Sequence, residues 1–144
     1  MTARSREEVP AQGAAALEVF LRSRGCPDFV VDAGLDGLIA RWEEIAAEVA
    51  KGYAAGLDDW LNDMDGRQLI EDSLPIAGRS IVRRLAARLE AADEIVRSHL
   101  VSAGRCVWGA GLARQHGWTA EREWWYFHVP RNPAARLKSD LVGG

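Results

Sequence analysis

The chain has 144 residues, of which 48% are hydrophobic and 27% are charged, and its formal net charge is −3. This length is that of one domain, and the composition is ordinary for a globular protein. The acidic balance argues against nucleic acid as a partner, because that partner requires a basic surface. No apolar run approaches the ~18 residues of a membrane span, and the two cysteines lack CxxC spacing. We therefore expect a cytoplasmic protein with no membrane partner.

The N-terminal region is predicted to hold a tail and one helix. Residues 1–13 are polar and small, so we expect a flexible tail before a single helical domain over residues 14–144. Residues 14–24 are rich in helix formers and place apolar side chains on one face. Gly25 and Pro27 then mark the end of this first helix.

Two longer helices are predicted as the central pair, over residues 35–53 and 76–102. Both carry apolar residues at steps of three and four, with charged residues on the opposite face. In the first, Trp42 lies on this apolar seam and is expected in the core. Gly34 is costly inside a helix, so we expect a break there and a restart at Leu35. Gly104 is the stop signal after the second.

The acidic segment 57–74 is predicted to form two short helices with a corner at Asp65–Gly66. Its aspartates resemble the ligands of an EF-hand loop only in part, because Leu61 stands where the first calcium ligand is needed. We therefore expect no metal site here. A solvated corner with acidic residues near helix starts accounts for the same pattern.

The C-terminal third is less regular. Thr119 is a good N-cap for a short helix that carries the aromatic run Trp124–Phe127. A strand over residues 123–129 is the competing interpretation, since aromatics favour strands, although no partner strand is evident. Pro130, Asn132 and Pro133 argue against regular structure beyond. The predicted fold is an all-α, antiparallel helical bundle with two long central helices and a short C-terminal aromatic-rich helix or lid.

The aromatic run is the first candidate binding surface. Four consecutive residues on a short helix radiate around it, so they cannot all face one core. We expect part of the run to form an exposed rim, and Trp and Tyr are enriched at interface hot spots. A purely structural lid is the alternative. The candidate partner-binding residues of this run are Trp124, Trp125, Tyr126 and Phe127.

A second candidate surface is a row of arginines on the helix predicted over 76–102. Pairs spaced by four residues line one face of its first half, and the residues are Arg79, Arg83, Arg84 and Arg88. They can bind the acidic surface of a partner, or a phosphate. The alternatives are a solvated face or ion pairs with the acids of residues 58–72.

No motif of catalysis or cofactor binding is found. The three histidines, His99, His116 and His128, match no zinc spacing, and the sequence leaves open whether they belong to a site. The serines and cysteines lie in no recognisable catalytic context. We therefore name no catalytic residue, no metal ligand and no cofactor, and we do not expect an enzyme.

The leading hypothesis is a small non-enzymatic bacterial-type module of accessory, regulatory or inhibitor/immunity-like kind, which binds another protein or itself as a homodimer. The alternative is an enzyme or small-ligand binder with a pocket between the bundle and the C-terminal lid. The polar groups of this pocket would come from His99, Arg84, Asp93, His116 or His128. A concave pocket with converging His, Asp and Arg would favour this alternative. An exposed patch of Trp and Arg would favour the module.

Overall fold

The computed structural model describes residues 12–143, so the predicted tail lies outside the described residues except at its last two positions. Those two are fixed to the bundle: the Gly13 amide donates to the Ile76 carbonyl at 2.9 Å, and the Gln12 side chain donates to the Pro75 carbonyl at 3.1 Å. The elements in chain order are α2 (Ala14–Ser23), α3 (Asp28–Lys51), α4 (Leu57–Ala77), α5 (Arg79–Ser98), β1 (Leu100–Ser102), α6 (Ala110–His116), the 3-10 helix η1 (Trp124–Tyr126), β2 (His128–Pro130) and α7 (Ala135–Gly143).

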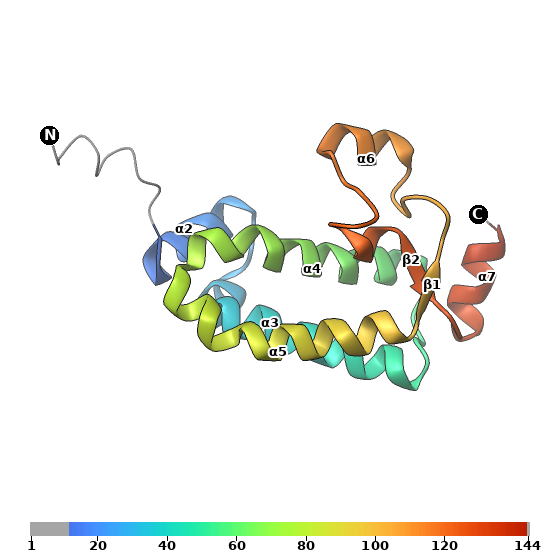
Figure 1. Ribbon diagram of the computed structural model, residues 1–144, viewed down its shortest axis with the longest axis horizontal. Coiled ribbons are helices and arrows are strands. Elements are labelled where there is room, and N and C mark those ends of the chain that lie inside the picture. The colour runs from blue at the N-terminus through green and yellow to red at the C-terminus, as the bar shows by residue number, and fades with distance from the viewer. Residues whose placement is uncertain (1–11, 144) are drawn as a thin grey trace, which may run out of the picture.

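The long helices α3, α4 and α5 form the body of the molecule, with α4 antiparallel to the other two (Figure 1). The predicted all-α bundle is confirmed. The expected central pair is present as α3 and α5, which pack closely along their length. The predicted break is also present, because Gly34 has φ 64° and kinks α3 at that residue. A positive φ of this kind is readily adopted only by glycine.

Three predicted helix boundaries in the middle of the chain are wrong. Residues 57–77 form one continuous helix, so there is no corner at Asp65–Gly66 and no calcium-binding loop geometry. Gly66 alone weakens a helix by about 1 kcal/mol, which packing on both sides of α4 outweighs. The following helix begins at Arg79, after Gly78 with φ 95°, and it ends at Ser98 instead of Ser102.

The C-terminal third combines the two structures that the sequence left open. Residues 124–126 form a 3-10 turn, and residues 128–130 form a strand. The partner strand was missed because its three residues continue the apolar spacing of α5: Val101 pairs antiparallel with Val129. The helix α7 was missed too. It begins just after Pro133, and its fully buried Leu137 and the bond from the Leu57 amide to Asp140 fix it to the start of α4.

One apolar cluster joins the bundle to the C-terminal segment. Trp42 is buried there, as predicted, together with the large side chains of Tyr53, Trp60, Trp125 and Tyr126. Within residues 12–143, no helix is long and apolar enough to cross a membrane.

Candidate functional site

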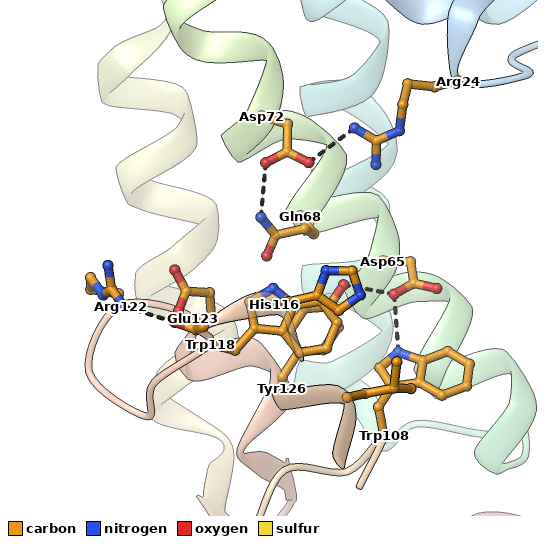
Figure 2. A pocket seen from close by; sticks show the side chains of 12 residues that line it. Arg24, Asp65, Gln68, Asp72, Trp108, His116, Trp118, Arg122, Glu123 and Tyr126 are labelled. Atoms are coloured by element: carbon orange, nitrogen blue, oxygen red, sulfur yellow. Dashed lines mark hydrogen bonds and ion pairs between the residues drawn. The ribbon is translucent and has the colours of Figure 1, made fainter. Parts of the chain in front are cut away.

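A hollow of about 580 Å³ lies between α4 and the segment 108–126, and we name it the α4 groove (Figure 2). One wall is a polar row on α4. The other is an aromatic wall from the C-terminal segment. The residues used below are Arg24, Asp65, Gln68, Asp72, Trp108, Leu112, His116, Trp118, Arg122, Glu123 and Tyr126.

The α4 wall consists of Asp65, Gln68 and Asp72. Their spacing of three and four residues places them on one face of the helix. The Gln68 amide donates to Asp72 at 3.0 Å, and Arg24 from the end of α2 donates to the other oxygen of Asp72 at 3.1 Å. Gln68 in turn accepts a hydrogen bond from the Trp125 indole at 3.1 Å. Gln68 and Asp72 are therefore linked to each other, to Arg24 and to Trp125 by hydrogen bonds.

The C-terminal segment is attached to this row by the polar atoms of its aromatic residues. One oxygen of Asp65 accepts two hydrogen bonds, from the Tyr126 hydroxyl at 2.7 Å and from the Trp108 indole at 3.0 Å. Burial raises the pKa of Tyr126 above its ordinary value, and the hydrogen bond to Asp65 adds to the shift. The phenol therefore stays protonated and keeps donating.

The rings of His116, Trp118 and Tyr126 are in contact in this order in the aromatic wall. Trp118 stacks on His116 with ring centroids 4.5 Å apart, and its other neighbour is Tyr126 at 4.1 Å. This requires the chain to reverse at the end of α6. Gly117 has φ 71° in the left-handed region, and the Trp118 amide then bonds back to the Ala113 carbonyl at 2.9 Å.

The turn below these rings carries charges of both signs. Glu123 accepts from the Thr119 amide at 2.8 Å, and Arg122 donates to the Gly117 carbonyl at 2.8 Å. Both side chains therefore support the shape of the turn as well as lining the groove.

A buried ion pair supports the groove from beneath. Arg67 is only 5% exposed and donates to both oxygens of Asp93 at 2.9 Å, and to Glu71 at 2.9 Å. Its guanidinium lies 4.4 Å from the ring centroid of Trp125. The Trp42 indole also donates to Asp93, at 2.8 Å. Burial alone would lower the pKa of Arg67, but the bonds and charges of its acidic partners outweigh this and the pKa is raised.

The exposed rim expected over residues 124–127 is reduced to one residue. Trp124, Trp125 and Tyr126 are buried, and only Phe127 is half-buried. The prediction assumed a helical run, whereas these residues form a 3-10 turn that leads into a strand, and the amides of Ala103 and Val107 donate to the Phe127 and Tyr126 carbonyls. Three of the four candidate residues therefore offer little surface to a partner, although Tyr126 still forms part of the groove wall.

Two arginines of the row on α5 form ion pairs, and the other two do not. Arg84 pairs with Asp36 at 3.1 Å, and Arg88 pairs with Glu43 at 2.7 Å. Their partners lie on α3, not in the acidic segment 58–72 as expected, because α5 packs along α3. Arg79 and Arg83 are exposed and form no ion pair within residues 12–143.

Of the five polar residues expected in a pocket beside the lid, only His116 lines the groove. Asp93 lies beneath it with Arg67, and Arg84 lies on the α3–α5 surface. His99 bonds to the Ile95 carbonyl and His128 to the Trp124 carbonyl, both at 2.8 Å through Nδ1. These two rings have local structural partners.

The polar row of α4 was missed as a site. The three residues keep helical spacing in the sequence, but Arg67 and Glu71 lie between them, so no clean polar stripe marks this face. The predicted corner at residue 66 concealed it. Among residues 12–143, no group of three or more His, Cys, Asp or Glu is arranged to hold a metal.

No protein family model, no curated protein and no solved structure matches this chain. The geometry of the groove is therefore the basis for a functional proposal.

Proposed function

We propose that the protein is a cytoplasmic, non-enzymatic module that binds another protein or a second copy of itself, and that the α4 groove receives a segment of this partner. The observation that carries the proposal is the groove wall, which joins the half-buried rings of Trp108 and Trp118 to charges of both signs. Trp, Tyr and Arg are the residue types in which interface binding energy concentrates.

The polar groups of the groove are suited to recognition. Asp65 and Asp72 each accept two structural hydrogen bonds, and Glu123 accepts one from the backbone. A carboxylate has about four acceptor sites, so these bonds hold each carboxylate in place and still leave lone pairs for a partner. Carboxylates held in this way fix the shape of a surface, and a fixed surface loses little conformational freedom on binding.

A small-ligand binder is the second candidate, and the concavity of the groove favours it. Its volume of about 580 Å³ falls within the range of small-molecule sites. His116, Asp65 and Arg122 also come together there, as the alternative hypothesis requires.

Site-specific photo-crosslinking in the native host distinguishes these candidates. A benzophenone amino acid at Leu112, which lines the groove, should capture one defined polypeptide or a second copy of the chain. The same probe at Val19, which is 71% exposed on α2, is the matched control and should not.

A groove variant completes the experiment. Trp118→Ser should abolish the crosslink from position 112, with circular dichroism confirming that the variant keeps its fold, because the ring is only half-buried. Equal capture from positions 112 and 19 contradicts the proposal. A small molecule that co-purifies with the wild type in native mass spectrometry, and is lost from Trp118→Ser, would instead establish the second candidate.

A further inference from the structure

Trp118 separates the α4 groove from a second hollow of about 420 Å³, which we name the α6 hollow. Residues 110, 113 and 114 line it from one face of α6, whereas residues 112 and 116 face the groove from the opposite side. The α6 hollow therefore lies on the other side of α6 and is a separate surface.

The floor of the α6 hollow is apolar. Trp118 and Phe127 are half-buried and Cys106 is buried, and Ala110 and Ala113 add small apolar side chains. Phe127 is the most exposed member of the aromatic run, since the other three are buried. An apolar floor of this kind suits a large apolar side chain, since burying such a group removes both surfaces from water.

The rim carries positive charge only. Arg105 and Arg114 both line the hollow, both are exposed, and no carboxylate lines it. Neither guanidinium has a hydrogen-bond or ion-pair partner within residues 12–143, in contrast to Arg84 and Arg88. In a chain with 21 acidic and 18 basic residues, a basic rim without carboxylates is a local departure.

We propose that the α6 hollow binds an acidic segment of a partner protein, with one aromatic or large aliphatic side chain on the floor and flanking carboxylates on Arg105 and Arg114. Guanidinium groups bind carboxylates in a planar, two-bond geometry, which adds direction to the charge attraction. The two arginines come from different segments, the loop after β1 and the last turn of α6. Two guanidinium groups on one rim can pair with two acids of one segment.

A polypeptide fits this surface better than a membrane does. Anionic lipid surfaces are recognised by clusters of about four to eight basic residues, and the α6 hollow offers two. This inference is independent of the α4 groove, since the two hollows share only Trp118 and its neighbour Gly117.

An unbiased peptide selection tests the proposal. A random twelve-residue display library is selected on the full chain, and bound peptides are sequenced. The expected peptides carry an aromatic or large aliphatic residue within three positions of at least two Asp or Glu. Enrichment of neutral or basic peptides, or no enrichment over the starting library, overturns the proposal.

Matched charge reversals locate the binding. Arg105→Glu/Arg114→Glu should weaken an enriched peptide by tenfold or more in fluorescence anisotropy. Arg79→Glu/Arg83→Glu changes the same number of exposed arginines on α5 and should alter the affinity less than twofold. Equal affinities for the two double variants overturn the proposal.

Two further measurements test the floor of the hollow and binding to a membrane. Phe127→Ala removes one aromatic ring of the floor and should also lower the affinity for the peptide tenfold, with circular dichroism confirming the fold. If this variant unfolds, the charge reversals decide alone. Vesicles containing phosphatidylserine are the membrane control. Binding to these vesicles that is lost in Arg105→Glu/Arg114→Glu, with no peptide enriched, assigns the surface to lipid and overturns the proposal.

Discussion

The bundle α2–α5 and the C-terminal segment 99–143 are held together in different ways. The bundle helices α3 and α5 join through apolar side chains at helical spacing, such as Trp42 and Leu85, which are almost fully buried. The C-terminal segment also packs into the apolar core, but it is held in addition by the N–H and O–H groups of aromatic rings, which donate to Asp65 and Gln68. The core thus has two contact regions, or seams: an apolar seam between the bundle helices and a partly polar seam between the bundle and the C-terminal segment.

The helix α4 makes this difference possible because both seams meet on it. Its buried residues include Met64 and Ile70, but also Arg67 and Ser73. A helix covered on two sides shows no single apolar stripe. Trp and Tyr are suited to the second side, because each buries a large ring and still needs a hydrogen-bond acceptor. The acidic composition of α4 therefore provides acceptors for an aromatic segment.

The largest expected effect is at the junction of the two seams. Arg67→Ala should lower the free energy of unfolding by about 3–5 kcal/mol, because it leaves the carboxylate of Asp93 largely buried without its cation. Asp93 is 18% exposed. Chemical denaturation monitored by tryptophan fluorescence measures this loss.

Two control variants sharpen this result. Arg84→Ala removes an exposed arginine from an ion pair and should cost less than about 1 kcal/mol. Arg67→Met/Asp93→Asn should recover part of the loss, since it removes the unpaired charge while the asparagine amide oxygen can still accept from the Trp42 indole. A loss below about 1 kcal/mol for Arg67→Ala, the level of an exposed pair, would show that the bundle and the C-terminal segment do not depend on this pair.

A smaller effect is expected from single hydroxyl deletions, one in each region. Tyr126→Phe removes the bond to Asp65, and Tyr53→Phe removes a similar bond to Asp63 at 2.5 Å. Each should cost roughly 1.5–3 kcal/mol, the range for hydrogen bonds to charged groups. Hydrogen exchange should show faster opening of residues 99–130 for Tyr126→Phe and of the α3–α4 connection for Tyr53→Phe. Identical exchange patterns would contradict two separately held regions.

The sequence predicts the apolar seam well and the polar seam poorly. The spacing around Trp42 and Leu85 repeats with the helical period, so it identifies α3 and α5 and the all-α class. It also identifies Gly34 as a break, because a glycine inside a strong periodic pattern has a specific conformational cost. These features depend on residues close together in the chain.

The candidate site depends on residues far apart in the chain. Asp65 meets Trp108 and Tyr126, which lie 43 and 61 positions away. No local pattern encodes such a contact, so local spacing predicts a solvated corner at Asp65 and an exposed rim at Tyr126. The pairing of β1 with β2 is hidden for the same reason, because three-residue strands carry almost no periodic signal of their own.

Loss of the indole bond from the half-buried Trp108 is expected to have a more local effect. Trp108→Phe should cost about 0.5–1.5 kcal/mol, less than Tyr126→Phe, because the bond from Trp108 to the same carboxylate is exposed to solvent and most of the ring is kept. Amide exchange should accelerate over residues 103–123 and remain unchanged in α3 and α5. Equal acceleration in the bundle would show that the α6 segment does not open independently.

The smallest expected effects are changes with pH in the free energy of unfolding, which test the charged groups of the bundle. The hydrogen bonds from Arg84 and Arg88 lower the pKa values of Asp36 and Glu43 below their ordinary values. Their contribution to stability is therefore present above the unfolded pKa values, near 4, and is lost as the pH falls through the folded ones. Burial acts in the opposite direction on Asp63 and raises its pKa, so its contribution is present at low pH and is lost as the pH rises through the folded pKa.

Urea midpoints between about pH 2.5 and 7 should show Arg84→Gln/Arg88→Gln converging on the wild type as the pH falls. Asp63→Asn should gain on the wild type as the pH rises, and added salt should reduce the first difference more than the second, because exposed pairs are screened and buried groups are not. A constant offset of both variants at every pH would contradict the assigned shifts.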